Sequence, residues 1–369
     1  MMAAAVSLAA ALVMAGPAVS LAFVLPPAAI ASSRHVVGRR VTHTHTADRK
    51  KGLSSPPCMS SYPQGVVEET AEDVAPDSQT LSEVLAAAVH AASEAGTLMK
   101  AKIGADVLKT KFNPKDLLTE VDSECQRVIE KVVAKQFPDH ALLGEESVEP
   151  GAEASTVALD KALRAGEQTD DGRASSEWLW IVDPIDGTTN FVHGMPLSAV
   201  SIGVAYRGEV VVGCIYDPFR GELFTAKRGS GAFLNSLTMQ VGDQASIGEA
   251  TVACGAPPGI LALGPCVRGM AALAPHVRTT RMLGSAAIML AWVACGRLTS
   301  YWEPDLNSWD IAAGALLITE AGGEMTDIDG SPYCLSTRAI IGSNKLVHEE
   351  IREKLVEAGA TRPDLTPQL

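Results

Sequence analysis

Two stretches in the first third of the chain have apolar residues at helical spacing. The first begins near Thr80, which forms a candidate capping box with Glu83, and its apolar positions are Leu81, Val84, Leu85, Ala88 and Ala92. The second has Thr119 as candidate N-cap and ends before Pro138, and its apolar positions are Val121, Cys125, Val128, Ile129 and Val132. The spacing predicts two amphipathic helices, with Asp122 in the first turn of the second, off its apolar stripe.

The pattern then changes to that of strands. Residues 178–182 form a continuous apolar run that predicts a buried strand. Three short strand-like runs, separated by Gly, Asp-Pro and Arg-Gly turns, follow at residues 200–206, 210–216 and 222–227. Together they predict an antiparallel meander. Residues 150–177 lack periodicity and predict a surface loop with a short helix at most.

Strand-like and helical runs alternate beyond about residue 250. The strand-like runs lie at residues 251–254 and 339–341, and the helical ones at 286–294, 311–321 and 347–356. Such alternation is typical of an α/β layer. We therefore expect an N-terminal α+β half over residues 79–248 and a C-terminal α/β half over residues 249–369.

Residues 1–60 have the composition of an address segment. An apolar run over residues 3–24 is interrupted by Gly16-Pro17, and residues 23–47 contain no acid but several Arg, Ser, Thr and His. The two parts resemble the bipartite signal and transit presequences of algae with secondary plastids. This predicts removal of the leader, delivery to the plastid stroma and no membrane span in the mature protein. The alternatives are a single secretory leader or a membrane anchor. Residues 61–78, polar and acidic, predict a flexible lead-in.

The charge balance narrows the choice of partners. The chain has 30 Lys and Arg against 43 Asp and Glu, a formal net charge of −13, and the first 60 residues hold six basic residues against one acidic residue. The remainder is therefore more acidic than the whole. Such a body repels phosphodiester backbones, which argues against nucleic acid as a partner and favours a bound cation. The seven cysteines are scattered without a Cys-x-x-Cys pair, a pattern typical of core-filling residues.

Acidic residues gather where predicted strands and helices begin or end. Asp183 lies at the end of the apolar strand predicted at residues 178–182. Pro184 is expected to turn the chain, and Asp186 follows two residues later. Two carboxylates held close together repel each other unless a cation lies between them, and oxygen ligands select a hard ion such as Mg²⁺. Gly187 and Thr188 could aim backbone N–H groups at an anion. The alternative is an acidic surface turn.

Three further acids stand at comparable positions. Glu145 follows an apolar Ala-Leu-Leu run, Asp310 opens a predicted helix, and Asp122 lies in a first helical turn. Asp310 and Asp122 also have the simpler reading of a helix cap or a side chain favoured by the helix dipole. With Asp183 and Asp186, they point to a metal-bound phosphate.

Three other motifs suggest competing chemistry. Cys214 and Arg220 have the Cys-x5-Arg spacing of cysteine phosphatases, but Pro218 and Asp217 between them are unsuited to a phosphate-binding loop. We interpret this segment as a strand and a turn. Residues 327–330, Asp-Ile-Asp-Gly, suit an Asp-Gly hairpin better than a phosphatase nucleophile. For His193, packing is preferred to a role as general base.

The same motifs resemble those of the magnesium-dependent, lithium-sensitive inositol monophosphatases. The resemblance rests on Glu145-Glu146-Ser147, on Asp183-Pro-Ile-Asp-Gly-Thr-Thr-Asn-Phe and on Trp309-Asp-Ile-Ala-Ala-Gly, in the family's order, and extends from about residue 80 to 358. Residues 301–303 (Tyr-Trp-Glu) and 281–287 look most like the plant and algal plastid branch. The resemblance implies a layered α+β sandwich, in which an antiparallel sheet with two N-terminal helices joins a smaller mixed α/β layer, and a homodimer.

The resemblance also implies roles for individual residues. Glu145, Asp183 and the Ile185 carbonyl would hold a first Mg²⁺; Asp183, Asp186 and Asp310 would hold a second; a third would lean on Glu145. Thr188, hydrogen-bonded to Asp122, would orient the attacking water, with Glu145 also in the catalytic set. The substrate would contact Asp186, Gly187, Thr188, Ala286, Glu303 and Asp310.

The implied activity is in-line hydrolysis of a small phosphate monoester, myo-inositol 1-phosphate above all. The alternatives are L-galactose 1-phosphate, histidinol phosphate or another small sugar phosphate. A catalytically idle scaffold is a second alternative. One departure from the family is the long spacing between Glu145 and Asp183, which could alter substrate range.

Overall fold

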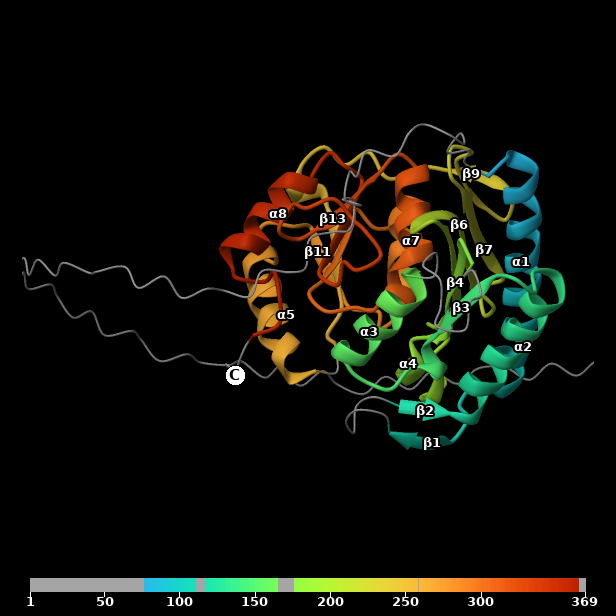
Figure 1. Cartoon of the computed structure of the whole chain (residues 1–369). Helices are drawn as coiled ribbons and strands as arrows, with labels where there is room; N and C mark the ends of the chain where they lie inside the picture. The colour runs from blue at the N-terminus through green and yellow to red at the C-terminus, as the bar shows by residue number, and fades with distance from the viewer. Residues whose placement is uncertain (1–75, 111–116, 165–175, 258, 365–369) are drawn as a thin grey trace, which may run out of the picture. The chain divides into compact units, whose positions relative to one another are not determined.

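The computed structural model of the chain describes residues 76–110, 117–164, 176–257 and 259–364 (Figure 1). The predicted leader, residues 1–60, and most of the lead-in lie outside these ranges. The described helices and strands form five layers, helix, sheet, helix, sheet, helix, which Figure 1 shows from α1 and α2 on one side to α5 and α8 on the other. This confirms the predicted layered sandwich.

Both predicted N-terminal helices are present, as α1 (Ser78–Lys102) and α2 (Glu120–Gln136), with a two-stranded hairpin, β1 (Val107–Thr110) and β2 (Leu117–Thr119), between them. The start predicted for the first helix is wrong. The Asp77 side chain accepts from the Thr80 N–H at 2.7 Å, so Asp77 is the N-cap and Thr80 already lies in the first turn. Thr119 caps α2 as predicted.

A seven-stranded sheet lies against α1 and α2. Its order is β3-β4-β5-β6-β7-β8-β9, and every pair is antiparallel except β3 with β4. This confirms the predicted meander. The strands are β3 (Ala141–Gly144), β4 (Trp178–Asp186), β5 (Ala199–Tyr206), β6 (Glu209–Asp217), β7 (Glu222–Lys227), β8 (Ala232–Leu234) and β9 (Leu237–Met239).

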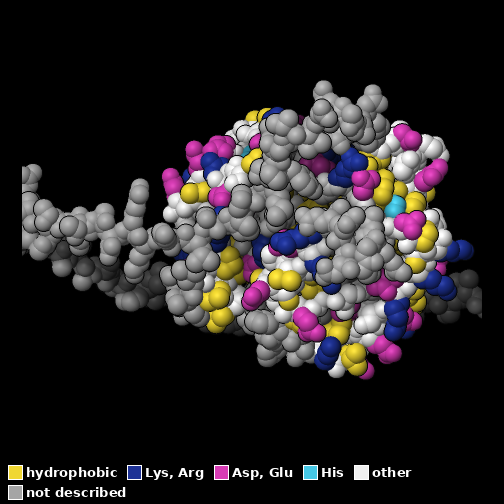
Figure 2. Space-filling model, in the orientation of Figure 1, with side chains coloured by type: hydrophobic (Ala, Val, Ile, Leu, Met, Phe, Trp, Pro, Cys, Tyr) yellow, Lys and Arg dark blue, Asp and Glu magenta, His cyan; other side chains and the backbone are white. Residues whose placement is uncertain are grey.

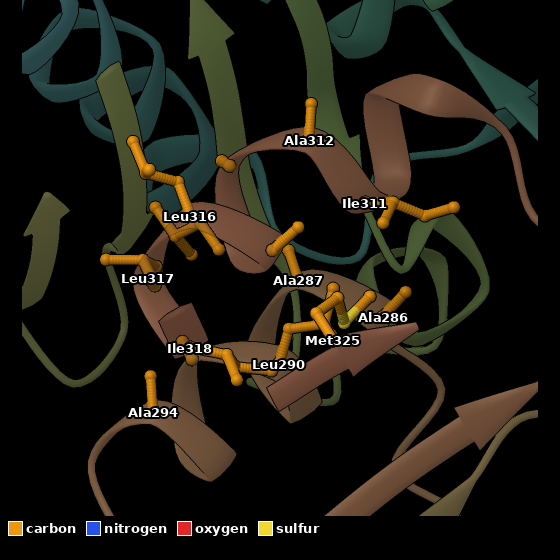
Figure 3. Close-up of a cluster of buried hydrophobic side chains, with 14 of the residues drawn as sticks. Ala286, Ala287, Leu290, Ala294, Ile311, Ala312, Leu316, Leu317, Ile318 and Met325 are labelled. Carbon is orange, nitrogen blue, oxygen red and sulfur yellow. The ribbon is translucent and has the colours of Figure 1, made fainter. Parts of the chain in front are cut away.

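Helices α6 (Ala286–Ala294) and α7 (Ser308–Glu320) fill the space between the two sheets. Small residues let the backbones approach: a Cβ at Gly203 of β5 would lie 2.7 Å from the Ala312 Cβ, and one at Gly314 would lie 2.5 Å from Leu290. Figure 3 shows Leu290 of α6 and Ile318 of α7 close to each other and to Met325, while Ala312 of α7 points to the other side. Because both sheets bury a face here, these helices are apolar on nearly all sides.

The second sheet has five strands in the order β11-β10-β12-β14-β13, parallel on both sides of β10 and antiparallel on both sides of β14. Its outer face packs against α5 (Ile260–Leu273) and α8 (His348–Glu357). The strands are β10 (Thr251–Cys254), β11 (Thr279–Arg281), β12 (Ser300–Glu303), β13 (Glu324–Asp327) and β14 (Ile340–Ser343). The mixed layer agrees with the predicted C-terminal architecture.

The competing motifs have structural roles. Cys214 is buried in β6, and the Asp217 carboxylate accepts from the N–H groups of Phe219 and Arg220 in the turn that follows, as interpreted. Asp327 begins a tight turn in which the Gly330 N–H donates to its carbonyl at 3.0 Å. His193 is exposed, so the expectation that it packs is wrong.

The surface of the described residues bears on the predictions about a membrane and about charged partners. Within the described ranges, no helix combines the length and apolar character that a bilayer crossing needs. Figure 2 shows acidic and basic side chains interspersed over the described part of one face.

Candidate metal centre and active site

The first two acids of the site come from a bulge at the end of β4. The sequence predicts that the strand ends at Asp183, but β4 continues to Asp186, and its register against β5 shifts between the two. Pro184 cannot donate to the sheet, and an extra residue in a strand re-aims its side chains. The Asp183 carboxylate accepts from the Ile185 N–H at 3.0 Å, which fixes the bulge.

The third acid comes from a helix more than a hundred residues later. Asp310 lies in the first turn of α7, and its carboxylate accepts from the Asn307 N–H at 2.7 Å. Asp183, Asp186 and Asp310 each offer a carboxylate oxygen, and these atoms all lie within 4.8 Å of one another. The N-cap of α7 is Asn307, so the reading of Asp310 as the N-cap is wrong, although its carboxylate does accept from the N-cap N–H. The carboxylate cluster forms as predicted.

Burial makes this cluster electrostatically unfavourable without a cation. Asp183 and Asp186 are buried. Desolvation raises the pKa of Asp186, and it raises the pKa of Asp310 well above its usual range, with the negative charges of Asp186 and Glu145 adding to the effect. A divalent cation would relieve both the desolvation and the repulsion.

The donor set fits a hard divalent cation. All three clustered side chains are carboxylates, the ligands that Mg²⁺ and similar ions prefer over soft metals. The Ile185 carbonyl, predicted as a further ligand, accepts from the Thr188 hydroxyl at 3.1 Å. We conclude that the residues present suit the ion that the sequence predicts.

Asp186 also joins the two halves of the fold. It accepts hydrogen bonds from the N–H groups of Ala286, at 3.2 Å, and Ala287, at 2.9 Å, and from the Ser285 hydroxyl, all at the start of α6. Ser285 in turn caps α6 by accepting from the Ile288 N–H. The N–H of Ala286, at the predicted substrate-contacting position, is thus engaged by Asp186 in this structure.

Thr188 and Asp122 lie together, as predicted. The Thr188 hydroxyl is 3.3 Å from Oδ1 of Asp122. Oδ2 of Asp122 accepts from the N–H of Thr119, at 2.8 Å, and from its hydroxyl. Asp122 was expected off the apolar stripe, and it is nevertheless buried because it points inward to these groups.

Gly187 precedes the short helix α4 (Thr188–Val192) with a φ of +90°. A Cβ there would lie 2.9 Å from the Leu197 carbonyl oxygen and 3.0 Å from that of Gly284. The left-handed backbone and the crowding both require glycine.

Glu145 stands at the rim of the site, in a single 3₁₀ turn (Glu145–Ser147) directly after β3. It is close enough to raise the pKa of both Asp186 and Asp310. A cavity of about 50 Å³ beside it is lined by Glu145, Glu149, Ser155, Asn307, Trp309 and neighbouring residues.

One wall of that cavity is formed by residues around the start of helix α3, where the structure differs from the prediction. Residues 150–177 were expected to form a surface loop with a short helix at most, but α3 (Ala152–Leu163) is a twelve-residue helix. Leu159 is buried in the core between the sheets, and this tertiary contact holds a helix that the sequence periodicity does not reveal.

Glu303, the predicted hydroxyl-binding residue, ends β12 and is buried. Its Oε2 accepts from the Tyr301 hydroxyl, and burial raises its pKa to about 8. The Glu303 carboxylate packs directly on Gly255, where a Cβ would fall 1.7 Å from Oε2. Sequence reasoning missed Gly255 and the pairing with Tyr301; the i, i+2 spacing on a strand was the available signal for the latter.

Comparison with known proteins gives a consistent result. The sequence profile of the inositol monophosphatase family matches residues 80–360. Inositol-1-monophosphatase from Synechocystis sp. is 36% identical over 280 residues, which cover 76% of this chain and 90% of that protein. Nus factor SuhB from Pseudomonas aeruginosa is 36% identical over 262 residues, which cover 70% of this chain and 90% of that protein. The solved structure of Thermotoga maritima IMPase superimposes with a TM-score of 0.64 at 31% identity, covering 75% of this chain and 98% of that one.

Proposed function

Because the chain belongs to the inositol monophosphatase family, we propose that it is a Mg²⁺-dependent phosphatase that releases phosphate from myo-inositol 1-phosphate. The observation that carries the proposal is the cluster of three carboxylates, the buried Asp183 and Asp186 and the half-buried Asp310, with oxygens within 4.8 Å of one another. Such a cluster is costly to bury and is suited to holding a divalent cation against a phosphate.

The ligand set that the resemblance implies includes all three clustered carboxylates, which supports the proposal. One ion would be bound by Glu145, Asp183 and the Ile185 carbonyl. Another would be bound by Asp183, Asp186 and Asp310. A third, weaker ion would be bound by Glu145. When bound, Mg²⁺ acidifies water and neutralises charge on the phosphate and on the leaving alkoxide.

Thr188 is the residue that orients the attacking water in this proposal. Its hydroxyl can give its single proton to Asp122 or to the Ile185 carbonyl, which leaves lone pairs to accept from the water. The water oxygen forms the new bond to phosphorus in line with the ester oxygen, the P–O ester bond breaks, and the leaving alkoxide takes up a proton. No phosphoenzyme forms on this route.

The substrate's ring would lie between Asp186, the start of α6 and Glu303. A buried carboxylate such as that of Glu303 suits vicinal hydroxyls, because it has a second oxygen besides the one that Tyr301 engages. The backbone at Gly187 and Thr188 would face the phosphate, with Ala286, Asp186 and Asp310 completing the contacts. L-galactose 1-phosphate, histidinol phosphate and other small sugar phosphates remain alternative substrates.

A second class of function is a scaffold without catalysis. One relative has the name Nus factor SuhB, which is not the name of a phosphatase, and this motivates the alternative for this chain. The presence of the complete carboxylate set with Thr188 and Asp122 favours the enzyme.

The test is phosphate release by the purified protein, full-length and lacking residues 1–60, across inositol, sugar and nucleotide monophosphates. We expect the fastest release from D-myo-inositol 1-phosphate with Mg²⁺, none with EDTA, and inhibition by lithium. A folded protein that is inactive on every ester with Mg²⁺ present would favour the scaffold.

We also propose that the mature protein is a homodimer in the plastid stroma, delivered by removal of residues 1–60. Support comes from the leader's composition and from the resemblance to the plastid branch. Light scattering of the mature protein reports the dimer.

A further inference from the structure

We propose that Arg338 is a positioning residue for the metal site: it ties helix α3 to the start of α7 and so fixes Asp310. The inference rests on the proposed function, because Asp310 matters here as a ligand. Arg338 lies in the segment before β14, outside the motifs that carry the resemblance.

The Arg338 guanidinium donates to three residues, Asp305 and Asn307 before α7 and Ser155 on α3. Its Nε and Nη2 point to Oδ1 of Asp305, at 2.8 and 2.7 Å. Its Nη1 donates to Oδ1 of Asn307 and to the Ser155 hydroxyl, both at 2.9 Å. The side chain is 27% exposed, so these bonds are partly shielded from water.

Two of these contacts fix the short segment between β12 and α7. That segment connects Glu303, the proposed substrate carboxylate at the end of β12, to the first turn of α7, which contains the proposed ligand Asp310. The Arg338 carbonyl also accepts from the Leu306 N–H at 2.9 Å. Both the main chain and the side chain of Arg338 therefore hold this segment.

Asn307 transmits the constraint to Asp310. Its side chain is held by Arg338, while its backbone N–H donates to Oδ2 of Asp310 at 2.7 Å. A shift of Asn307 would therefore re-aim the Asp310 carboxylate. Residues behind the ligands typically influence metal affinity in this way.

The contact with Ser155 brings α3 into the same arrangement. Ser155 is buried, and it lines the cavity beside Glu145 together with Asn307 and Trp309. Arg338 therefore joins two residues that line this cavity, Ser155 on α3 and Asn307 before α7. The three-way geometry requires the planar fork of arginine, which lysine cannot reproduce.

The experiment compares Arg338→Gln with wild type and with a matched control, Arg362→Gln, in the full chain. Arg362 pairs with Asp329 at the surface, at 2.8 Å, and is not placed in the site. Binding of Mn²⁺ is measured directly by electron paramagnetic resonance, without substrate. We expect R338Q to raise the half-saturating Mn²⁺ concentration about 10- to 100-fold, with faster amide exchange over residues 152–163, and R362Q to change neither.

An R338Q protein that melts cooperatively and binds Mn²⁺ as wild type does would overturn the inference. If R338Q does not fold, Arg338→Lys decides, because lysine keeps the charge but not the three-way contact. A higher half-saturating Mn²⁺ concentration in R338K supports the inference, and an unchanged one contradicts it. Failure of the proposed function is distinguishable, because then wild type itself would not bind Mn²⁺.

Discussion

Gly255 is predicted to be constrained by a single side chain, that of Glu303, whose carboxylate packs against it. A Cβ on residue 255 would lie 1.7 Å from Oε2 and 2.2 Å from Cδ of Glu303, so the carboxylate must leave its position. Gly255 is not among the glycines with positive φ, so the backbone itself accepts alanine.

The cost of Gly255→Ala follows from what Glu303 loses. Burial raises the pKa of Glu303 to about 8, so the side chain is mostly protonated at neutral pH, and its hydrogen bond with Tyr301 contributes about 0.5–1.5 kcal/mol as a neutral pair. Overpacking in a well-packed region costs about 1–3 kcal/mol. Because the two describe the same displacement, we expect G255A to lower the free energy of unfolding by about 1–3 kcal/mol.

The assay is urea unfolding in EDTA, performed in three backgrounds. In wild type and in Glu303→Gln, whose side chain has the same size, G255A should be destabilising. In Glu303→Ala the obstructing atoms are gone, so the same change should cost less than about 0.5 kcal/mol. An equal cost in all three backgrounds would refute the reasoning, because it would place the strain in the backbone rather than at Glu303.

Three other outcomes are expected. Asp186→Asn should melt cooperatively yet lose turnover at least about 100-fold, because an amide replaces an oxygen that the cation needs; near-normal turnover would show the site to be misassigned. Thr188→Val should lower kcat about 10²- to 10⁴-fold with Mn²⁺ binding unchanged, while Thr188→Ser keeps most activity; equal losses in both variants would contradict the role of the hydroxyl. Mass spectrometry of the native protein should find an N-terminus beyond residue 22, and a start at Met1 would defeat the presequence.

Elements with strong local signals were predictable from the sequence. The meander and helices α2, α6 and α7 have either clear periodicity or apolar runs bounded by turns, and the structure confirms them. The acids of the site were predictable for a related reason: each stands at an element's end, where a folded chain brings side chains to a common edge.

Two of the elements that were missed, α5 and β12, depend on contacts distant in sequence. Helix α5 contains Pro265, which suggests a break, and it is held by packing on α8 and the outer face of the five-stranded sheet. Strand β12 is only four residues long and pairs with β10 and β14 on either side. The contacts of Asp186 with α6 span about a hundred residues, and no local pattern reports them.

The most direct test of the account is the location of bound metal in crystals of the protein grown with Mn²⁺, by anomalous diffraction. We expect density between the carboxylates of Asp183, Asp186 and Asp310, at the cluster where their oxygens lie within 4.8 Å of one another. Full occupancy elsewhere with none at these three residues, in crystals of active protein, would contradict the central claim.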